Sequence, residues 1–131
     1  MPSIATRAPR VGNLVKAEQL LEHGYCREGV TVNVASETTL SVGSVLGKVT
    51  SSGKYVTSDP DAVDGSEVAA AICLENKTVA ATTDTEVAVL IRGAAIVGRD
   101  ALVYDVDHDA TEAGVAEAEL EALGILVRTQ I

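Results

Sequence analysis

Residues 42–75 read VGSVLGKVTSSGKYVTSDPDAVDGSEVAAAICLE, and the fold is organised around them. Residues 44–50 alternate and are rich in β-branched side chains, which is typical of a strand. A turn follows, where Gly53 is free to take a positive φ, and residues 55–57 return as a second strand. After two polar turns, residues 68–74 form an apolar run long enough for a strand that is buried on both faces. The stretch predicts a hairpin followed by a core strand.

Further strands are predicted on both sides of this stretch, at residues 30–34, 86–92, 94–98, 101–104 and 125–128. Residues 36–39 are expected to form a polar turn, and residues 75–84 a polar surface loop. The strands follow one another without a β-α-β alternation, so the sheet should be antiparallel or mixed. The chain is therefore expected to be mainly β (α+β), with a compact mixed β-sheet or barrel-like domain.

One helix is predicted near the end of the chain, from Asp109 to Leu123. Asp109 and Glu112 have the capping-box spacing, and Gly124 is placed to end the helix in the left-handed conformation. The apolar face of this C-terminal helix is expected to cover the sheet.

Residues 1–29 are expected to form an extended N-terminal arm ahead of a β-rich domain of residues 30–131. Residues 1–12 contain two prolines, two arginines and little hydrophobic pattern, which is typical of a mobile tail. Residues 13–22 are compatible with about two helical turns, a run too short to be stable alone. This run could pack on its own domain or become ordered on a partner.

Composition sets broad limits on what the chain does. It has 131 residues, enough for one domain, and its core must be built from Val, Leu, Ile and Ala because it has no Phe and no Trp. Such side chains bury less area each than aromatic ones, and a core of this kind gains from association with copies of itself. The net charge of -9 disfavours binding to DNA or to an anionic membrane.

The two cysteines, Cys26 and Cys73, lack the spacing of a metal site. Cys73 lies in the apolar run and is expected to be a small buried hydrophobic residue. A disulfide is not expected, which fits a reducing cytoplasm. Neither a transmembrane helix nor a signal segment is predicted, because no apolar run approaches about 20 residues and the N-terminus is not apolar.

Two sequence patterns that carry chemistry in other proteins are incomplete here. Residues 47–55 resemble a phosphate-binding loop, but Lys48 removes its flexible first turn and Tyr55 is too long for the Mg²⁺ position. Residues 105–109 carry alternating carboxylates like the start of a calcium loop, yet alanines stand at the later Gly and Glu positions. A weak surface cation site and a plain polar turn before the helix both remain open.

No catalytic residue, cofactor or metal ligand is predicted. His23 and His108 have no nearby Cys or His to complete a metal site, and apolar surroundings disfavour Cys73 as a nucleophile. Lys54, at a hairpin tip, is placed like the modified lysine of lipoyl and biotinyl carriers, but no Met stands beside it. Nothing assembles a nucleophile, a base and an oxyanion donor, so the chain is not expected to be an enzyme.

The order of the motifs, more than any single one, resembles a known family. VLGKVTSSGKYV, then DP, then DGSEVAAAICLE are similar to segments of the bacteriophage head decoration proteins, the lambda D-like proteins that cement and stabilise capsids. The resemblance continues upstream in KAEQLLEHGYCREGVTV and downstream in EVAVLIRGAAIVGRDAL and LEALGILVR, and so covers most of the chain. Ala71 departs from the family's pattern, where a Gly is expected, which affects only the local backbone geometry.

The resemblance implies a non-enzymatic structural protein of the virion. It implies a homotrimer that binds the major capsid protein on the outer surface of the expanded head and stabilises the shell against the pressure of packaged DNA. It places the chain in the host cytoplasm during assembly. Neither a nucleic acid nor a membrane is an expected partner.

Within the arm, Leu14, Val15, Tyr25 and Arg27 are the residues expected to contact the capsid. An extended segment can add itself as a strand to an exposed sheet edge, so that backbone hydrogen bonds supply affinity and side chains supply fit. The alternative that the sequence leaves open is a small β-barrel carrier or ligand-binding module. Its site would be Lys54 or the mouth of the barrel.

Overall fold

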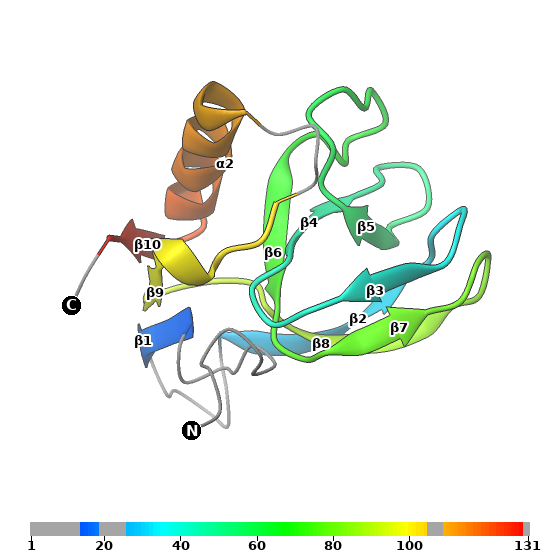
Figure 1. The fold of residues 1–131 in the computed structure, drawn as a ribbon, viewed down its shortest axis with the longest axis horizontal. Helices are drawn as coiled ribbons and strands as arrows, with labels where there is room; N and C mark the ends of the chain where they lie inside the picture. Colours follow the sequence, from blue (N-terminus) through cyan, green and yellow to red (C-terminus); the bar gives the residue numbers. More distant parts are fainter. Residues whose placement is uncertain (1–13, 19–25, 105–108, 130–131) are drawn as a thin grey trace, which may run out of the picture.

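The computed structural model describes residues 14–18, 26–104 and 109–129, and its strands form a closed barrel, a three-stranded sheet and a two-stranded ribbon (Figure 1). The elements, in chain order, are β1 (Val15–Glu18), β2 (Arg27–Val32), β3 (Thr38–Leu40), β4 (Val45–Lys48), β5 (Tyr55–Thr57), β6 (Ala69–Cys73), β7 (Lys77–Val79), β8 (Thr85–Leu90), β9 (Ala95–Gly98), η2 (Arg99–Ala101), α2 (Ala110–Ala122) and β10 (Ile125–Arg128). The mainly β fold with a barrel and a C-terminal helix is thereby confirmed.

Residues 42–75 supply three of the five barrel strands, β4, β5 and β6, and β2 and β8 close the barrel from either side of that stretch. The barrel strands run in the order β2-β5-β4-β6-β8, and β4 and β5 form the predicted hairpin with Lys48 opposite Tyr55. Gly53 turns this hairpin with a φ of 71°. Antiparallel pairs predominate, but β2 pairs with β5 in parallel, so the sheet is mixed as expected.

Strand β6 is buried on both faces, as its apolar run predicted. Ala71 and Cys73 belong to the core of the barrel, whereas Ile72 and Leu74 belong to a second core under α2. Successive side chains of a strand point to opposite faces, so one strand can serve both cores. Ala71, the departure from the family's pattern, is fully buried opposite Leu46 of β4.

A separate sheet of three strands lies beside the barrel, in the order β1-β9-β10. In Figure 1 it lies at the opposite end of the molecule from the β3–β7 ribbon. Helix α2 packs on β10 and β6, and its own Ala116 and Leu120 side chains are buried. Asp109 caps α2 in a complete capping box with Glu112, and Gly124 follows the helix with a φ of 89°, both as predicted.

The helix expected over residues 13–22 is wrong over residues 15–18, although Leu14 just before them is helical. Residues 15–18 form β1, which pairs antiparallel with β9, with Val15 opposite Val97. A run this short gains little from helix propensity, and the exposed edge of β9 offers its backbone groups partners across the sheet. Residues 19–22 of the predicted helix lie outside the described part of the chain.

Two segments expected to be irregular form a two-stranded ribbon instead. Thr38 and Thr39 belong to β3, and the segment of residues 75–84 contains β7. The two strands pair antiparallel, with Leu40 opposite Lys77, and Val79 is fully buried. Both strands are three residues long and mostly polar, so their alternation is too brief to stand out in the sequence.

Candidate functional site

The three-stranded sheet brings together the first and the last strand of the described chain. β1 pairs antiparallel with β9 and β10 pairs parallel with it, so that β1 and β10 form the two edges. Edge strands carry backbone N–H and C=O groups that can pair with a strand of another protein. Strand β1 lies within the expected arm of residues 1–29, and residues 1–13, which precede it in the chain, lie outside the described residues.

Leu14 and Val15, two of the residues expected to contact a capsid, lie in this sheet. Leu14 is 0% exposed and shares a core with Val97 and Ile125, and Val15 is half-buried against the same core. A side chain that is fully enclosed by its own chain contributes to folding. In this conformation Leu14 therefore anchors β1, and its side chain is not presented to a partner.

The other two predicted residues lie elsewhere. Arg27 is exposed at the start of β2, opposite Leu90 of β8, and so belongs to the barrel. Tyr25 lies outside the described residues. The expected boundary between arm and domain at residue 29 falls inside β2, and Cys26, just before that strand, is fully buried.

A polar cluster beside the three-stranded sheet was not predicted. Arg99 of η2 donates to the Glu117 carboxylate at 2.8 Å and also bonds the Thr129 hydroxyl, so it links α2 to the end of β10. Burial, with a further contribution from the negative charge of Glu117, raises the pKa of nearby Tyr104 to about 12. Arg99 and Glu117 are 18 residues apart, and no local pattern in the sequence connects them.

The phosphate-loop pattern is a strand and a hairpin turn in the structure. Gly47 lies within β4, where an added Cβ would sit 2.2 Å from the Ser66 carbonyl oxygen, so this glycine is required by close packing. Asp109, the last residue of the calcium-like pattern, accepts a hydrogen bond from the Glu112 backbone at 2.8 Å as the helix cap. Residues 105–108 and His23 lie outside the described residues.

Lys54 is held by an ion pair. Its Nζ lies 2.9 Å from Asp84 Oδ1, which also accepts a hydrogen bond from Asn33 at 2.7 Å. The partners lie on separate turns at one end of the barrel, so the contact ties these turns together. A carrier lysine must instead reach out with its attached group, and the ion pair opposes that role.

The barrel interior is filled by side chains, which weighs against the ligand-binding alternative. Val32, Leu46 and Val87 are 0% exposed within its core, and so is Cys73. Burial raises the pKa of the Cys73 thiol, which disfavours a nucleophilic thiolate. Among the described residues, no group of three His, Cys, Asp or Glu side chains is placed to hold a metal ion. No helix in that part of the chain is long and apolar enough to cross a membrane.

Comparison with known proteins points to one family. The family model described as bacteriophage lambda head decoration protein D matches residues 4–125. That range contains the barrel, strands β1 and β9, and helix α2. No curated protein matches the chain.

Proposed function

The chain belongs to the bacteriophage lambda head decoration protein D family, and on that basis we propose that it binds the outside of the expanded phage head as a homotrimer. Family membership implies binding to a phage capsid and a place on the virion. The match over residues 4–125 carries the proposal, because it spans nearly the whole chain. In the proposed role the chain meets the major capsid protein in the host cytoplasm and performs no catalysis.

The proposed effect is mechanical stabilisation of the shell. A trimer that bridges several capsid subunits makes several contacts at once, so a subunit can separate from its neighbours only after many contacts break together. Linked contacts of this kind hold far more strongly than each contact alone. Decoration would then oppose the outward pressure of packaged DNA.

Residues 1–13 are the proposed attachment segment. They precede β1, an edge strand anchored by the fully buried Leu14. An extended segment that adds to a sheet edge of a capsid subunit is ordered at a cost of roughly 1–2 kcal/mol of backbone entropy per residue. Three such segments on one trimer would compensate for weak individual binding through avidity.

Electron microscopy of decorated heads tests the proposal. Full-length protein is mixed with expanded heads assembled from the major capsid protein of the same phage, beside a variant that lacks residues 1–13. The full-length chain should add three-lobed density at local threefold positions. The variant should stay folded by circular dichroism, but most of it should remain in the supernatant when the heads are sedimented. A variant lacking residues 130–131 is the matched control and should bind like the full-length chain.

Two results would count against the proposal. Heads that remain bare with full-length protein at saturating concentration would contradict the decoration role. Normal decoration by the variant that lacks residues 1–13 would leave that role intact, but would move attachment to the barrel or to the three-stranded sheet.

A further inference from the structure

Two exposed apolar side chains lie next to β6, and one of them, Val63, is the most exposed large apolar side chain of the described residues. The apolar side chains of β6 and β8 are enclosed by the chain itself, since Ile72, Val87 and Leu90 are all 0% exposed. Val63 is 96% exposed and Val68 is 44% exposed, and both lie in the segment that leads into β6. Val115, Val103 and Leu123 are exposed elsewhere, each by 54% or less, so this segment presents the strongest apolar feature for association in the described part of the chain.

The loop of residues 58–66 that carries Val63 is held in one conformation by hydrogen bonds. The Ser58 hydroxyl donates to the Ser66 carbonyl at 3.0 Å, and the Asp64 carboxylate accepts from the Ser66 backbone at 3.0 Å. The Asp64 carbonyl accepts from the Thr50 backbone at 2.9 Å, which fixes the loop to the end of the β4 segment. Val63 is thus presented on a preorganised loop, which lowers the entropy cost of binding.

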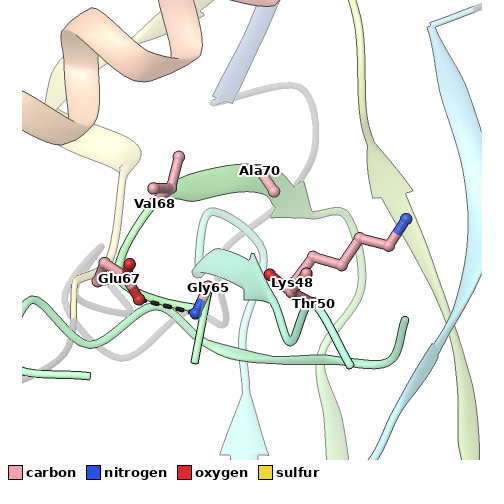
Figure 2. A pocket seen from close by; sticks show the side chains of 6 residues that line it. All are labelled: Lys48, Thr50, Gly65, Glu67, Val68 and Ala70. Carbon is pink, nitrogen blue, oxygen red and sulfur yellow. Dashed lines mark hydrogen bonds between the residues drawn. The ribbon is translucent and has the colours of Figure 1, made fainter. Parts of the chain in front are cut away.

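A hollow of about 540 Å³ opens directly beside this loop (Figure 2). Its lining residues are Lys48, Thr50, Gly65, Glu67, Val68 and Ala70. In Figure 2 the Glu67 carboxylate turns toward the Gly65 backbone, which donates to it at 2.9 Å, while the Lys48 side chain extends along the other side. Val68, Ala70 and Gly65 contribute apolar surface to the hollow, and its charged groups are the Lys48 ammonium and the Glu67 carboxylate, which the Gly65 backbone already binds.

We propose that the Val63 loop of one copy seats in this hollow on the next copy, and that three such contacts close the trimer. The inference rests on the proposed function, which supplies the trimer. A head-to-tail contact between identical copies closes into a ring when the rotation that relates neighbours closes, and a threefold rotation gives a trimer. Features that lie side by side, as Val63 and the hollow do, can meet their symmetry copies around a rotation axis.

Charge favours this pairing over one through Val115 on α2, the next most exposed large apolar side chain of the described residues. The Val63 loop carries the exposed carboxylate of Asp61, and the hollow of the next copy offers the Lys48 ammonium. Helix α2 has four glutamates and no basic residue, so packing one α2 against another would bring like charges together. A second copy is therefore the occupant that the loop and the hollow fit.

Cross-linking between two single-cysteine variants tests this contact. Val63→Cys and Thr50→Cys proteins are mixed in equal amounts, added to heads, and treated with a short bis-maleimide. The mixture should give a covalent dimer, because the loop of one variant meets the hollow of the other. Cys26 and Cys73 are fully buried and should not react. The protein without an introduced cysteine, treated with the same bis-maleimide, checks this. Val115→Cys mixed with Thr50→Cys is the matched control and should give no dimer.

A second measurement reads the contact without cysteines. Val63→Asp should weaken association of the copies by roughly tenfold or more, because a buried valine is replaced by a charge, whereas Val115→Asp should leave association unchanged. The inference would be overturned if trimers are visible on heads but the Val63→Cys and Thr50→Cys pair gives no dimer. It would also be overturned if the Val115→Cys and Thr50→Cys pair gives a dimer instead. Either result would leave the proposed function standing. A full-length chain that neither decorates heads nor forms trimers would overturn both.

Discussion

Replacing Leu14 by alanine should destabilise the whole domain, although Leu14 lies in the segment expected to be an arm. Its side chain is 0% exposed and shares a core with Val97, Leu120 and Ile125. Truncating a fully buried leucine costs roughly 2–5 kcal/mol, through lost burial and the cavity left behind. A domain of this size is stable by only about 5–15 kcal/mol, so we expect a loss of a large fraction of its free energy of unfolding.

Urea unfolding followed by circular dichroism measures this loss, since the chain has no Trp to report by fluorescence. With a urea dependence of about 1–3 kcal/mol/M, the midpoint of the Leu14→Ala variant should fall by roughly 1–3 M. Deleting residues 1–13 should leave the midpoint nearly unchanged. Val115→Ala, at a 54% exposed position outside the proposed contact, is the matched apolar truncation and should lower stability by less than about 0.5 kcal/mol.

An unchanged midpoint for Leu14→Ala would refute this reasoning. It would mean that β1 is not part of the stable domain in solution, and the boundary at residue 29 would then be the better description. A longer truncation should destabilise the domain, unlike the deletion of residues 1–13. Deleting residues 1–28 would remove Leu14, all of β1, the buried Cys26 and the start of β2, so we expect that protein to lose its cooperative unfolding.

Three further changes have defined outcomes. Gly47→Ala should lower thermal stability by about 1–3 kcal/mol or more, because its Cβ would sit 2.2 Å from the Ser66 carbonyl oxygen; an unchanged melting temperature would contradict that packing. Asp109→Ala should cost about 1 kcal/mol through loss of the helix cap, read by urea unfolding, and Asp109→Asn should retain most of it. Burial raises the pKa of Tyr104 from 10.0 to about 12, so the folded state favours its neutral form. The resulting stability is full below pH 10.0 and is lost as the pH rises through about 12. Tyrosinate absorbance should show a late transition that Tyr104→Phe removes.

Features with local signals were predictable from the sequence. The cap at Asp109 depends on Glu112 three residues later, and the β4–β5 hairpin depends on Gly53 at its turn. Strand β6 was visible because a strand that serves two cores must be apolar at nearly every position. Each of these signals is contained within a few residues, so no knowledge of the tertiary structure was needed.

Features that depend on distant partners were not predictable in this way. Val15 lies opposite Val97, and Leu40 lies opposite Lys77, so the pairing that makes each segment a strand lies far along the chain. The same limit applies to the candidate interface. Val63 follows an Asp-Pro-Asp-Ala turn that is polar in composition, and only the three-dimensional structure places its side chain in solvent beside a hollow.

The position of β1 also affects how the proposed attachment would resist force. If residues 1–13 bind the capsid, a pull on them acts first on β1, whose hydrogen bonds to β9 run across the direction of the strand and must break together when the strand slides. Sliding would also withdraw Leu14 from the core beneath α2. Attachment to the head and stability of the domain are therefore coupled through one sheet. Leu14→Ala should weaken decoration of heads more than its effect on the folded fraction explains. Residues 1–13 would still be present, but β1 would detach from β9 more easily without the buried Leu14 side chain.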